Sequence, residues 1–308
     1  MHTNRNMARE KILIIGAGEL GMAVLRQLAK TAAQSSVSVI LRPSTINSEA
    51  VGKRTHIDEL TALGIDILSG DIVRDSVSDL AKQFAGFDTV VTCVGFAAGA
   101  GAQVKLAHAA IESGIRRYFP WQFGVDYDVI GRGSAQDLFD EQLDVRDILR
   151  SQDQMEWVIV STGMFTSFLF EPAFGVVDLS RNTVYALGSW ETSVTVTTPE
   201  DIGLLTTHIL FAEPRIANQV VYIAGDTVTY GKLADIVDAV LGRTVSRVEW
   251  SVTKLKADLA EDPVDPIKKY RVAFAEGKGV AWDKSTTFNA QEGIAITSVE
   301  GWVQQNLK

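Results

Sequence analysis

Short apolar runs alternate with segments of helical spacing through the first half of the chain. The runs are rich in Val, Ile and Leu, and the segments between them carry apolar residues three and four positions apart. This alternation predicts parallel strands joined by right-handed helical crossovers, in a sheet covered on both faces. The expected strands are 11–15, 37–41, 65–68, 89–94 and 117–119. The expected helices are 19–33, 57–63, 77–84, 104–113 and 134–151.

The pattern changes after Gly163, where a Phe-rich stretch and shorter strands replace the regular alternation. The fold class predicted is α/β, a doubly wound parallel sheet of the Rossmann type with a smaller α+β substrate lobe. No Gly/Ser/Pro linker separates the parts cleanly, so we expect an interleaved division into residues 1–162 and 163–308. A strand near 219–224 is a candidate to rejoin the first sheet. Further strands are expected near 184–187 and 194–198, and helices near 201–210, 233–241 and 298–305.

Composition narrows the class of protein. The 308 residues are 46% hydrophobic and 22% charged, a balance typical of a folded chain rather than a disordered one. A formal net charge of −9 without a Lys/Arg-rich run argues against nucleic acid or an anionic membrane as partner. One cysteine and four scattered histidines indicate neither an internal disulfide nor a metal site. Without a signal peptide or an apolar stretch of about 18 residues, we expect a cytoplasmic protein.

The strongest local motif is GAGELG, which follows the first expected strand and begins the first expected helix. Its glycines permit a tight turn, a close approach of the backbone to a diphosphate, and close packing of the helix on the strand. The helix N-terminus adds free N–H groups and the positive end of its dipole. A turn that binds nothing is the alternative, but the strand before and the helix after favour dinucleotide binding. The residues concerned are Gly16, Gly18, Glu19, Leu20 and Gly21.

The end of the second expected strand favours NADP(H) over NAD(H). NAD sites usually carry Asp or Glu there for the ribose 2′-hydroxyl. Here Arg42 stands 21 residues after Gly21, and a guanidinium can hold a 2′-phosphate with two hydrogen bonds. Lys53 follows in the next segment and adds positive charge. A solvated surface arginine is the alternative interpretation.

Ligands of open α/β sheets lie beyond the carboxyl ends of the strands, so the next three loops also supply candidates. Asp71 follows the third strand and could reach an adenine amino group, or simply cap a helix. Cys93, Gly95 and Phe96 lie where the fourth strand ends, beside the expected ribose or nicotinamide, although Cys93 is more commonly a small buried apolar residue. The loop after the fifth strand, residues 120–124, is expected near the reacting end.

A polar residue interrupts the apolar stripe of the expected helix 134–151. Gln142 lies four positions after Leu138 and three before Val145. An amide on such a stripe needs a hydrogen-bond partner or a ligand, and a bond to nearby backbone explains it equally well. The Tyr-x-x-x-Lys pair of many short-chain dehydrogenases is absent, because no tyrosine has Lys four positions later.

The sequence resembles the isoflavone reductase-like proteins, an NmrA-like branch of the atypical short-chain dehydrogenases. The resemblance is carried by GAGELG, Arg42, TCVGF, and above all FPWQFGVDYD followed by FDEQLDVRDILR. It implies NADPH-dependent reduction of an aromatic, phenylpropanoid-derived substrate. It also implies cofactor contacts from the glycine motif, Arg42, Lys53, Gly95 and Phe165, with Phe123 near the substrate or nicotinamide.

The chain departs from the pattern of the family it resembles at one position. Family reductases carry a catalytic Lys on the helix after the Phe-Gly-x-Asp loop, and Gln142 stands at that position here. A neutral amide can only hydrogen-bond, whereas an ammonium can donate a proton. Tyr127 and Asp126 are the nearest alternative groups in the sequence. A chain that binds NADP(H) without turnover, as NmrA-like regulators do, is the competing hypothesis.

The predicted function is that of an NADPH-dependent oxidoreductase acting on an aromatic or small hydrophobic carbonyl or conjugated substrate, as a monomer or homodimer. The candidate catalytic residues are Gln142, Tyr127 and Asp126. The candidate cofactor-binding residues are Gly16, Gly18, Glu19, Leu20, Gly21, Arg42, Lys53, Asp71, Cys93, Gly95, Phe96, Gln122 and Phe165. The candidate substrate-binding residues are Trp121, Phe123, Met164 and Phe168.

Overall fold

The computed structural model describes residues 9–31 and 35–307. They form two compact units, each assembled from separated stretches of the chain. Of these described residues, the first unit comprises 9–31, 35–121, 145–159 and 206–219, and the second comprises 122–144, 160–205 and 220–307. Residues 122–144 thus fall in the second unit and residues 206–219 in the first, so each unit is built from stretches on both sides of residue 162.

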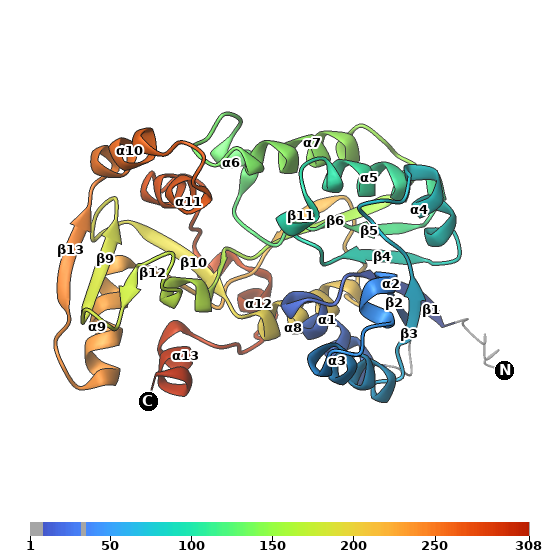
Figure 1. Cartoon of the computed structure of the whole chain (residues 1–308), viewed down its shortest axis with the longest axis horizontal. Helices are drawn as coiled ribbons and strands as arrows, with labels where there is room; N and C mark the ends of the chain where they lie inside the picture. The colour runs from blue at the N-terminus through green and yellow to red at the C-terminus, as the bar shows by residue number, and fades with distance from the viewer. Residues whose placement is uncertain (1–8, 32–34, 308) are drawn as a thin grey trace. The chain divides into compact units, whose positions relative to one another are not determined.

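A seven-stranded sheet in the order β11-β6-β5-β4-β1-β2-β3 dominates the first unit (Figure 1). Its neighbours from β3 through β6 pair in parallel. The central strands are apolar and buried, Ile12 to Ile15 being 0% exposed, because helices cover both faces. The strands are β1 Glu10–Ile15, β2 Ser35–Leu41, β3 Asp66–Ser69, β4 Thr89–Thr92, β5 Arg117–Phe119, β6 Glu156–Ser161 and β11 Gln219–Tyr222.

The crossover helices lie on both sides of this sheet, with α1 and α3 on one side and α4 and α5 on the other (Figure 1). The doubly wound Rossmann architecture predicted from the sequence is therefore confirmed. The helices are α1 Glu19–Lys30, α2 Pro43–Ile46, α3 Val51–Ala62, α4 Val77–Phe84, α5 Ala102–Ser113, α7 Leu138–Arg150 and α8 Pro199–Leu210, with the 3₁₀ turn η1 Phe96–Ala98.

A buried arginine joins β5 to the end of α8. Arg117 is 1% exposed, and its guanidinium donates to the carbonyl oxygens of Leu210 at 2.6 Å and Ile216 at 2.7 Å. It also lies 4.8 Å from the ring centroid of Phe119. Burial lowers the pKa of Arg117 from 12.5 to about 10, with repulsion from Arg215 adding to the effect. The side chain thus remains charged at neutral pH while satisfying carbonyls at a helix end.

The second unit contains two three-stranded sheets, ordered β12-β10-β7 and β13-β9-β8. Its strands are β7 Met164–Phe165, β8 Val177–Asp178, β9 Thr183–Leu187, β10 Ser193–Thr197, β12 Asp226–Thr229 and β13 Ser246–Trp250. Its helices are α6 Tyr127–Ile130, α9 Tyr230–Leu241, α10 Val252–Glu261, α11 Pro266–Ala275, α12 Phe288–Gln291 and α13 Val299–Asn306. Two short 3₁₀ turns are η2 Thr166–Phe170 and η3 Lys284–Thr286.

Several elements differ from the expectations. The helix expected at 57–63 is α3, which begins at Val51, because Leu60 is its only buried residue and apolar spacing marks little of its length. The expected strand 89–94 ends at Thr92. Apolar spacing likewise does not predict β6, α10 or α11. Caps mark the two helices instead: Ser251 accepts from Lys254 N, and Asp265 precedes Pro266 at the first helical position.

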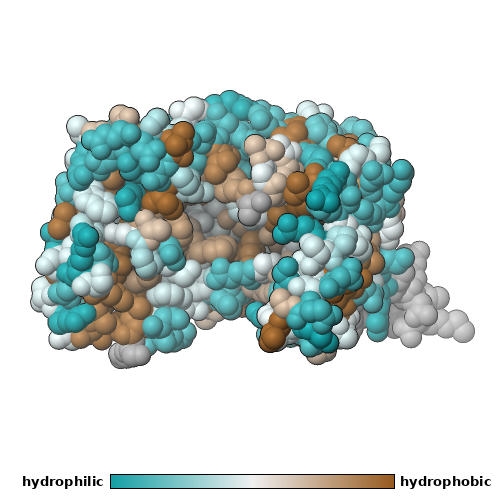
Figure 2. All heavy atoms as spheres, viewed as in Figure 1, coloured by the Kyte–Doolittle hydropathy of each residue, from teal (hydrophilic) through white to brown (hydrophobic). Residues whose placement is uncertain are grey.

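Hydrophilic residues cover most of the face seen in Figure 2. Large hydrophobic side chains that are exposed occur singly along the sequence, which is ordinary for a folded protein. They are Val51, Val73, Val129, Leu179, Val248 and Val264.

Candidate functional site

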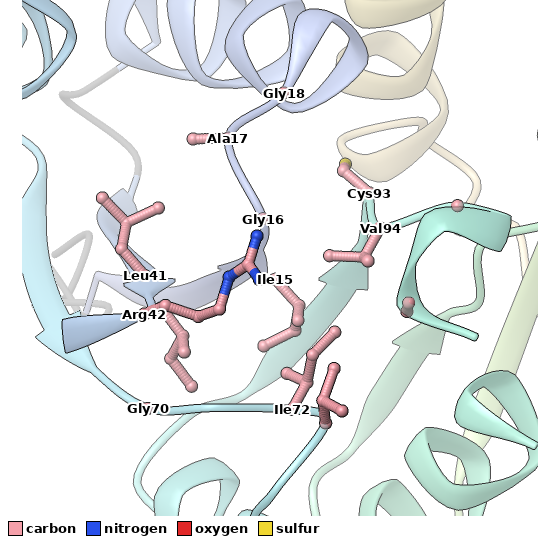
Figure 3. Close-up of a pocket in the computed structure, with 14 residues that line it drawn as sticks. Ile15, Gly16, Ala17, Gly18, Leu41, Arg42, Gly70, Ile72, Cys93 and Val94 are labelled. Carbon is pink, nitrogen blue, oxygen red and sulfur yellow. The ribbon is translucent and has the colours of Figure 1, made fainter. Parts of the chain in front are cut away.

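A cavity of about 280 Å³ lies in the first unit at the carboxyl ends of β1, β2 and β4 (Figure 3). β1 pairs with β2 on one side and β4 on the other, so this is where the strand order reverses. Open α/β sheets bind their ligands at such a switch point. The lining residues are 15–18, 40–42, 70, 72, 73, 93–95 and 98.

The glycine turn contributes to this lining. Gly16 has a φ of +89°, and a Cβ there would collide with the side chain of Val94. A Cβ on Gly21 would collide with the carbonyl oxygen of Gly16, so glycine allows α1 to pack this closely. A Cβ on Gly18 would meet nothing within 4 Å. The backbone at Gly18 is therefore open to a ligand.

The first turn of α1 provides donors next to the same turn. Gly18 is the N-cap and offers no side chain, and the first intrahelical hydrogen bond runs from Met22 N to Gly18 O at 2.8 Å. The N–H groups of Glu19, Leu20 and Gly21 precede that bond, so the helix supplies no acceptor for them. Such groups, together with the helix dipole, favour an anion.

Arg42 follows β2 directly, and Figure 3 shows its side chain extending into the cavity. Within residues 9–31 and 35–307, no hydrogen bond or ion pair engages its guanidinium. Arg54 differs, because it pairs with Glu49 at 2.7 Å. Lys53 is exposed on α3 and is not part of the lining. A free cation therefore lines the same cavity as the glycine turn.

The loop after β3 lines the cavity with apolar residues rather than with a carboxylate. Asp71 Oδ1 accepts from Val73 N at 3.0 Å and Arg74 N at 3.3 Å, so it closes a turn. The cap of α4 is Ser76. Ile72 and Val73 line the cavity instead, and nothing in their sequence pattern distinguishes them from ordinary core residues.

The loop after β4 packs against an aromatic side chain of the first unit. A Cβ on Gly95 would lie 2.8 Å from Trp121 Cζ2, and Phe96 meets Trp121 edge-on at 4.6 Å between ring centroids. Gly95 and Cys93 line the cavity, whereas Phe96 and Trp121 do not. The indole of Trp121 therefore packs against this loop without lining the cavity.

Cys93 should be unreactive in the folded chain. Its side chain is buried, and burial raises the pKa of the thiol from 9.0 to about 12. The thiolate population at pH 8 is then about a thousandfold below that of an exposed cysteine. We expect iodoacetamide to modify the unfolded chain rapidly and the native chain very slowly, as followed by intact mass, and equal rates would contradict the burial. The pKa of Cys93 is higher in the folded chain than in the unfolded chain. Ionisation of this thiol therefore leaves the free energy of unfolding unchanged below pH 9 and lowers it as the pH rises towards 12.

Two glutamines after β5 and on α7 meet inside the second unit. Gln122 Nε2 donates to Gln142 O at 2.9 Å and to Gln142 Oε1 at 3.1 Å, and both residues are 0% exposed. Gln142 Nε2 has no partner among the described residues. The structure therefore joins two of the predicted site residues and leaves one buried amide donor unused.

The other two candidate catalytic residues, Asp126 and Tyr127, contact other residues of the second unit. Asp126 caps α6 by accepting from Val129 N at 3.3 Å, and its second oxygen accepts from Tyr222 at 2.8 Å. Tyr127 is 2% exposed and meets the ring of Phe139 edge-on at 5.2 Å. A Cβ on Gly124 would lie 2.5 Å from its hydroxyl oxygen. The hydroxyl thus lies directly over the Phe-Gly-x-Asp loop.

The candidate aromatic substrate residues belong partly to a core cluster. Phe168 stacks on Phe174 at 4.6 Å and contacts Tyr270 at 6.2 Å between ring centroids. Phe123 and Met164 are buried, and Phe165 is half-buried at the end of β7. Burial raises the pKa of Tyr270. Phe168 therefore packs with other rings of its own unit, as Phe at such spacing commonly does.

The family model that describes the NmrA-like family matches residues 8–301. The chain belongs to the NmrA-like family. An NmrA-like family domain-containing oxidoreductase of Gibberella moniliformis is 49% identical over 298 residues, covering 96% of this chain and 97% of the relative. The phenylcoumaran benzylic ether reductase of Betula pendula is 26% identical, covering 96% and 98%. The NmrA-like chain is thus an oxidoreductase related to this phenylcoumaran benzylic ether reductase.

Solved structures share the same fold over the whole length. An isoflavone reductase superposes with a TM-score of 0.80 at 21% identity, covering 97% of this chain and 99% of that one. The complex of leucoanthocyanidin reductase with NADPH from Vitis vinifera gives a TM-score of 0.77 at 19% identity, covering 96% and 98%. At these identities the likeness establishes the fold.

Residues 9–31 and 35–307 contain no group of three or more His, Cys, Asp or Glu side chains arranged to hold a metal ion. In the same part of the chain, no helix combines the length and apolar character needed to cross a membrane.

Proposed function

We propose that this NmrA-like oxidoreductase binds NADP(H) in the cavity of the first unit and reduces a C=C or C=O bond of a small aromatic substrate. The observation that carries the proposal is the guanidinium of Arg42, which lies in the cavity that contains the glycine turn and has no hydrogen bond or ion pair with any described residue. A lone cation beside an anion-binding helix end matches a ligand with a second, separate phosphate. NADP(H) differs from NAD(H) by such a phosphate.

The residues present fit this cofactor. The open backbone at Gly18 and the N–H groups of Glu19, Leu20 and Gly21 would hold the diphosphate. Ile72 and Val73 offer an apolar wall for the adenine ring. They take the place of the contact expected from Asp71, because the Asp71 carboxylate already closes a turn. Lys53 and Phe165 remain proposed contacts from the family resemblance, and Phe96 and Gln122 remain proposed contacts from their places in the loops after β4 and β5.

The chemistry divides between the cofactor and the chain. NADPH supplies a hydride when bound, and the chain supplies orientation and stabilisation of charge on the substrate. We assign the unused amide of Gln142 to the substrate oxygen, where a hydrogen bond stabilises developing negative charge. Tyr127 is the proposed proton source, since Asp126 already accepts two hydrogen bonds. An aromatic substrate is supported by the related plant reductases, with Trp121, Phe123, Met164 and Phe168 as proposed contacts.

Binding and turnover together test this function. Calorimetry with NADPH and NADH should show a clear preference for NADPH. NADPH oxidation is then followed by absorbance with benzylideneacetone, acetophenone and benzaldehyde as acceptors, because these offer conjugated and simple carbonyl groups. Tight NADPH binding without oxidation in a wider panel would favour the NmrA-like sensor that binds the cofactor without turnover. No NADPH binding at millimolar concentration would remove the proposal altogether.

A further inference from the structure

The side-chain amides of Gln122 and Gln142 each have a defined orientation, which a backbone carbonyl determines. The backbone carbonyl of Gln142 can only accept, so the end of the Gln122 amide that lies 2.9 Å from it must be the NH₂ group. The same NH₂ group lies 3.1 Å from the Gln142 side chain, which must therefore offer its carbonyl oxygen in return. A backbone atom that cannot rotate thus determines the orientation of both side-chain amides.

The consequence is a fixed donor. With its carbonyl oxygen held by Gln122, Gln142 has its NH₂ group left over, and that group has no partner among the described residues. Both glutamines are 0% exposed, so bulk solvent does not reach this NH₂ group. Buried polar groups are nearly always hydrogen-bonded, and exceptions call for a ligand or another specific cause.

We propose that Gln122 is a positioning residue that presents Gln142 as a hydrogen-bond donor, so that the site selects substrates through an oxygen acceptor. This inference rests on the proposed function and specifies its substrate class: an aromatic molecule whose carbonyl, ether or phenolic oxygen receives the Gln142 NH₂ group. An isostere that lacks the oxygen would leave the buried donor unpaired and is rejected for that reason.

Two probes of nearly the same shape test the selection. Acetophenone carries a carbonyl oxygen where α-methylstyrene carries a methylene group, and each is titrated by calorimetry into protein saturated with NADPH. The wild-type chain should bind acetophenone about tenfold more tightly, the usual effect of one such hydrogen bond. In Gln122→Met the Gln142 amide is free to turn, so the ratio of the two dissociation constants should fall to about threefold or less.

Gln136→Met is the matched control. Gln136 is also 0% exposed, and its amide donates to Pro266 O at 3.3 Å, so the substitution removes a buried amide of the same unit. The ratio in this variant should equal that of the wild type. Equal losses of binding for both probes in Gln122→Met, at unchanged ratio, would mean a merely structural role and would overturn the proposal.

A second variant serves if Gln122→Met does not fold. Gln142→Glu keeps the shape and the acceptor for Gln122 but replaces the NH₂ group by oxygen, so acetophenone should lose its advantage entirely. A surviving tenfold preference in this variant overturns the proposal. A wild-type chain that binds NADPH but does not distinguish the probes also overturns it, and the cofactor assignment stands. A wild-type chain that does not bind NADPH instead removes the proposed function on which the inference rests.

Discussion

Replacing Arg42 by alanine should weaken NADPH binding by about ten- to a hundredfold and leave NADH binding almost unchanged. The guanidinium lines the cavity without an ion pair or hydrogen bond among residues 9–31 and 35–307, so its removal breaks no internal contact. A hydrogen-bonded charge pair with a 2′-phosphate is possible only for NADPH, because NADH carries no such phosphate. Calorimetry with both dinucleotides on the same protein preparation measures the two effects.

Arg54→Ala is the matched control for this prediction. Arg54 is an exposed arginine of α3 that pairs with Glu49, and it does not line the cavity. Its removal changes the net charge by the same amount, so it reveals how much of the effect comes from the general field. Comparable losses in both variants, or equal losses for NADPH and NADH in Arg42→Ala, would contradict a phosphate contact at Arg42.

The part of the candidate site around the glycine turn could be predicted because its geometry is local. The glycine turn lies between one strand and one helix, and the length of α1 with β2 determines where Arg42 emerges. The six residues of GAGELG thus determine the turn, and the spacing between Gly21 and Arg42 determines the position of the guanidinium. Ile72 and Val73 were missed for a physical reason, since apolar residues at a strand end resemble ordinary core positions in the sequence.

The second half depends on contacts that spacing does not encode. Gln122 and Gln142 are twenty residues apart and meet only because α7 packs against the loop after β5. The sequence indicated that Gln142 needed a partner, but not that the partner was another candidate residue. Arg117 is a similar case, because its carbonyl partners are 92 to 99 residues away along the chain.

Gly18→Ala should abolish most NADPH binding while leaving the fold intact. The φ of Gly18 is −72°, which alanine adopts freely, and the added Cβ meets nothing within 4 Å, so the melting temperature should not fall. The methyl group would occupy the space that a diphosphate needs in order to reach the backbone. Overpacking of this kind costs about 1–3 kcal/mol, which predicts a loss of affinity of about five- to a hundredfold for NADPH and NADH alike.

Alanine variants of two other glycines distinguish a loss of NADPH binding from a loss of stability. Gly86→Ala also adds a methyl group that meets nothing within 4 Å, but Gly86 does not line the cavity, so both binding and stability should match the wild type. Gly21→Ala places the methyl group against the carbonyl oxygen of Gly16, so its melting temperature should fall. Calorimetry and thermal unfolding on the three variants distinguish a blocked ligand from a strained turn. Wild-type affinity in Gly18→Ala would mean that no diphosphate approaches this backbone, because the added methyl group leaves nowhere else for the close contact to form.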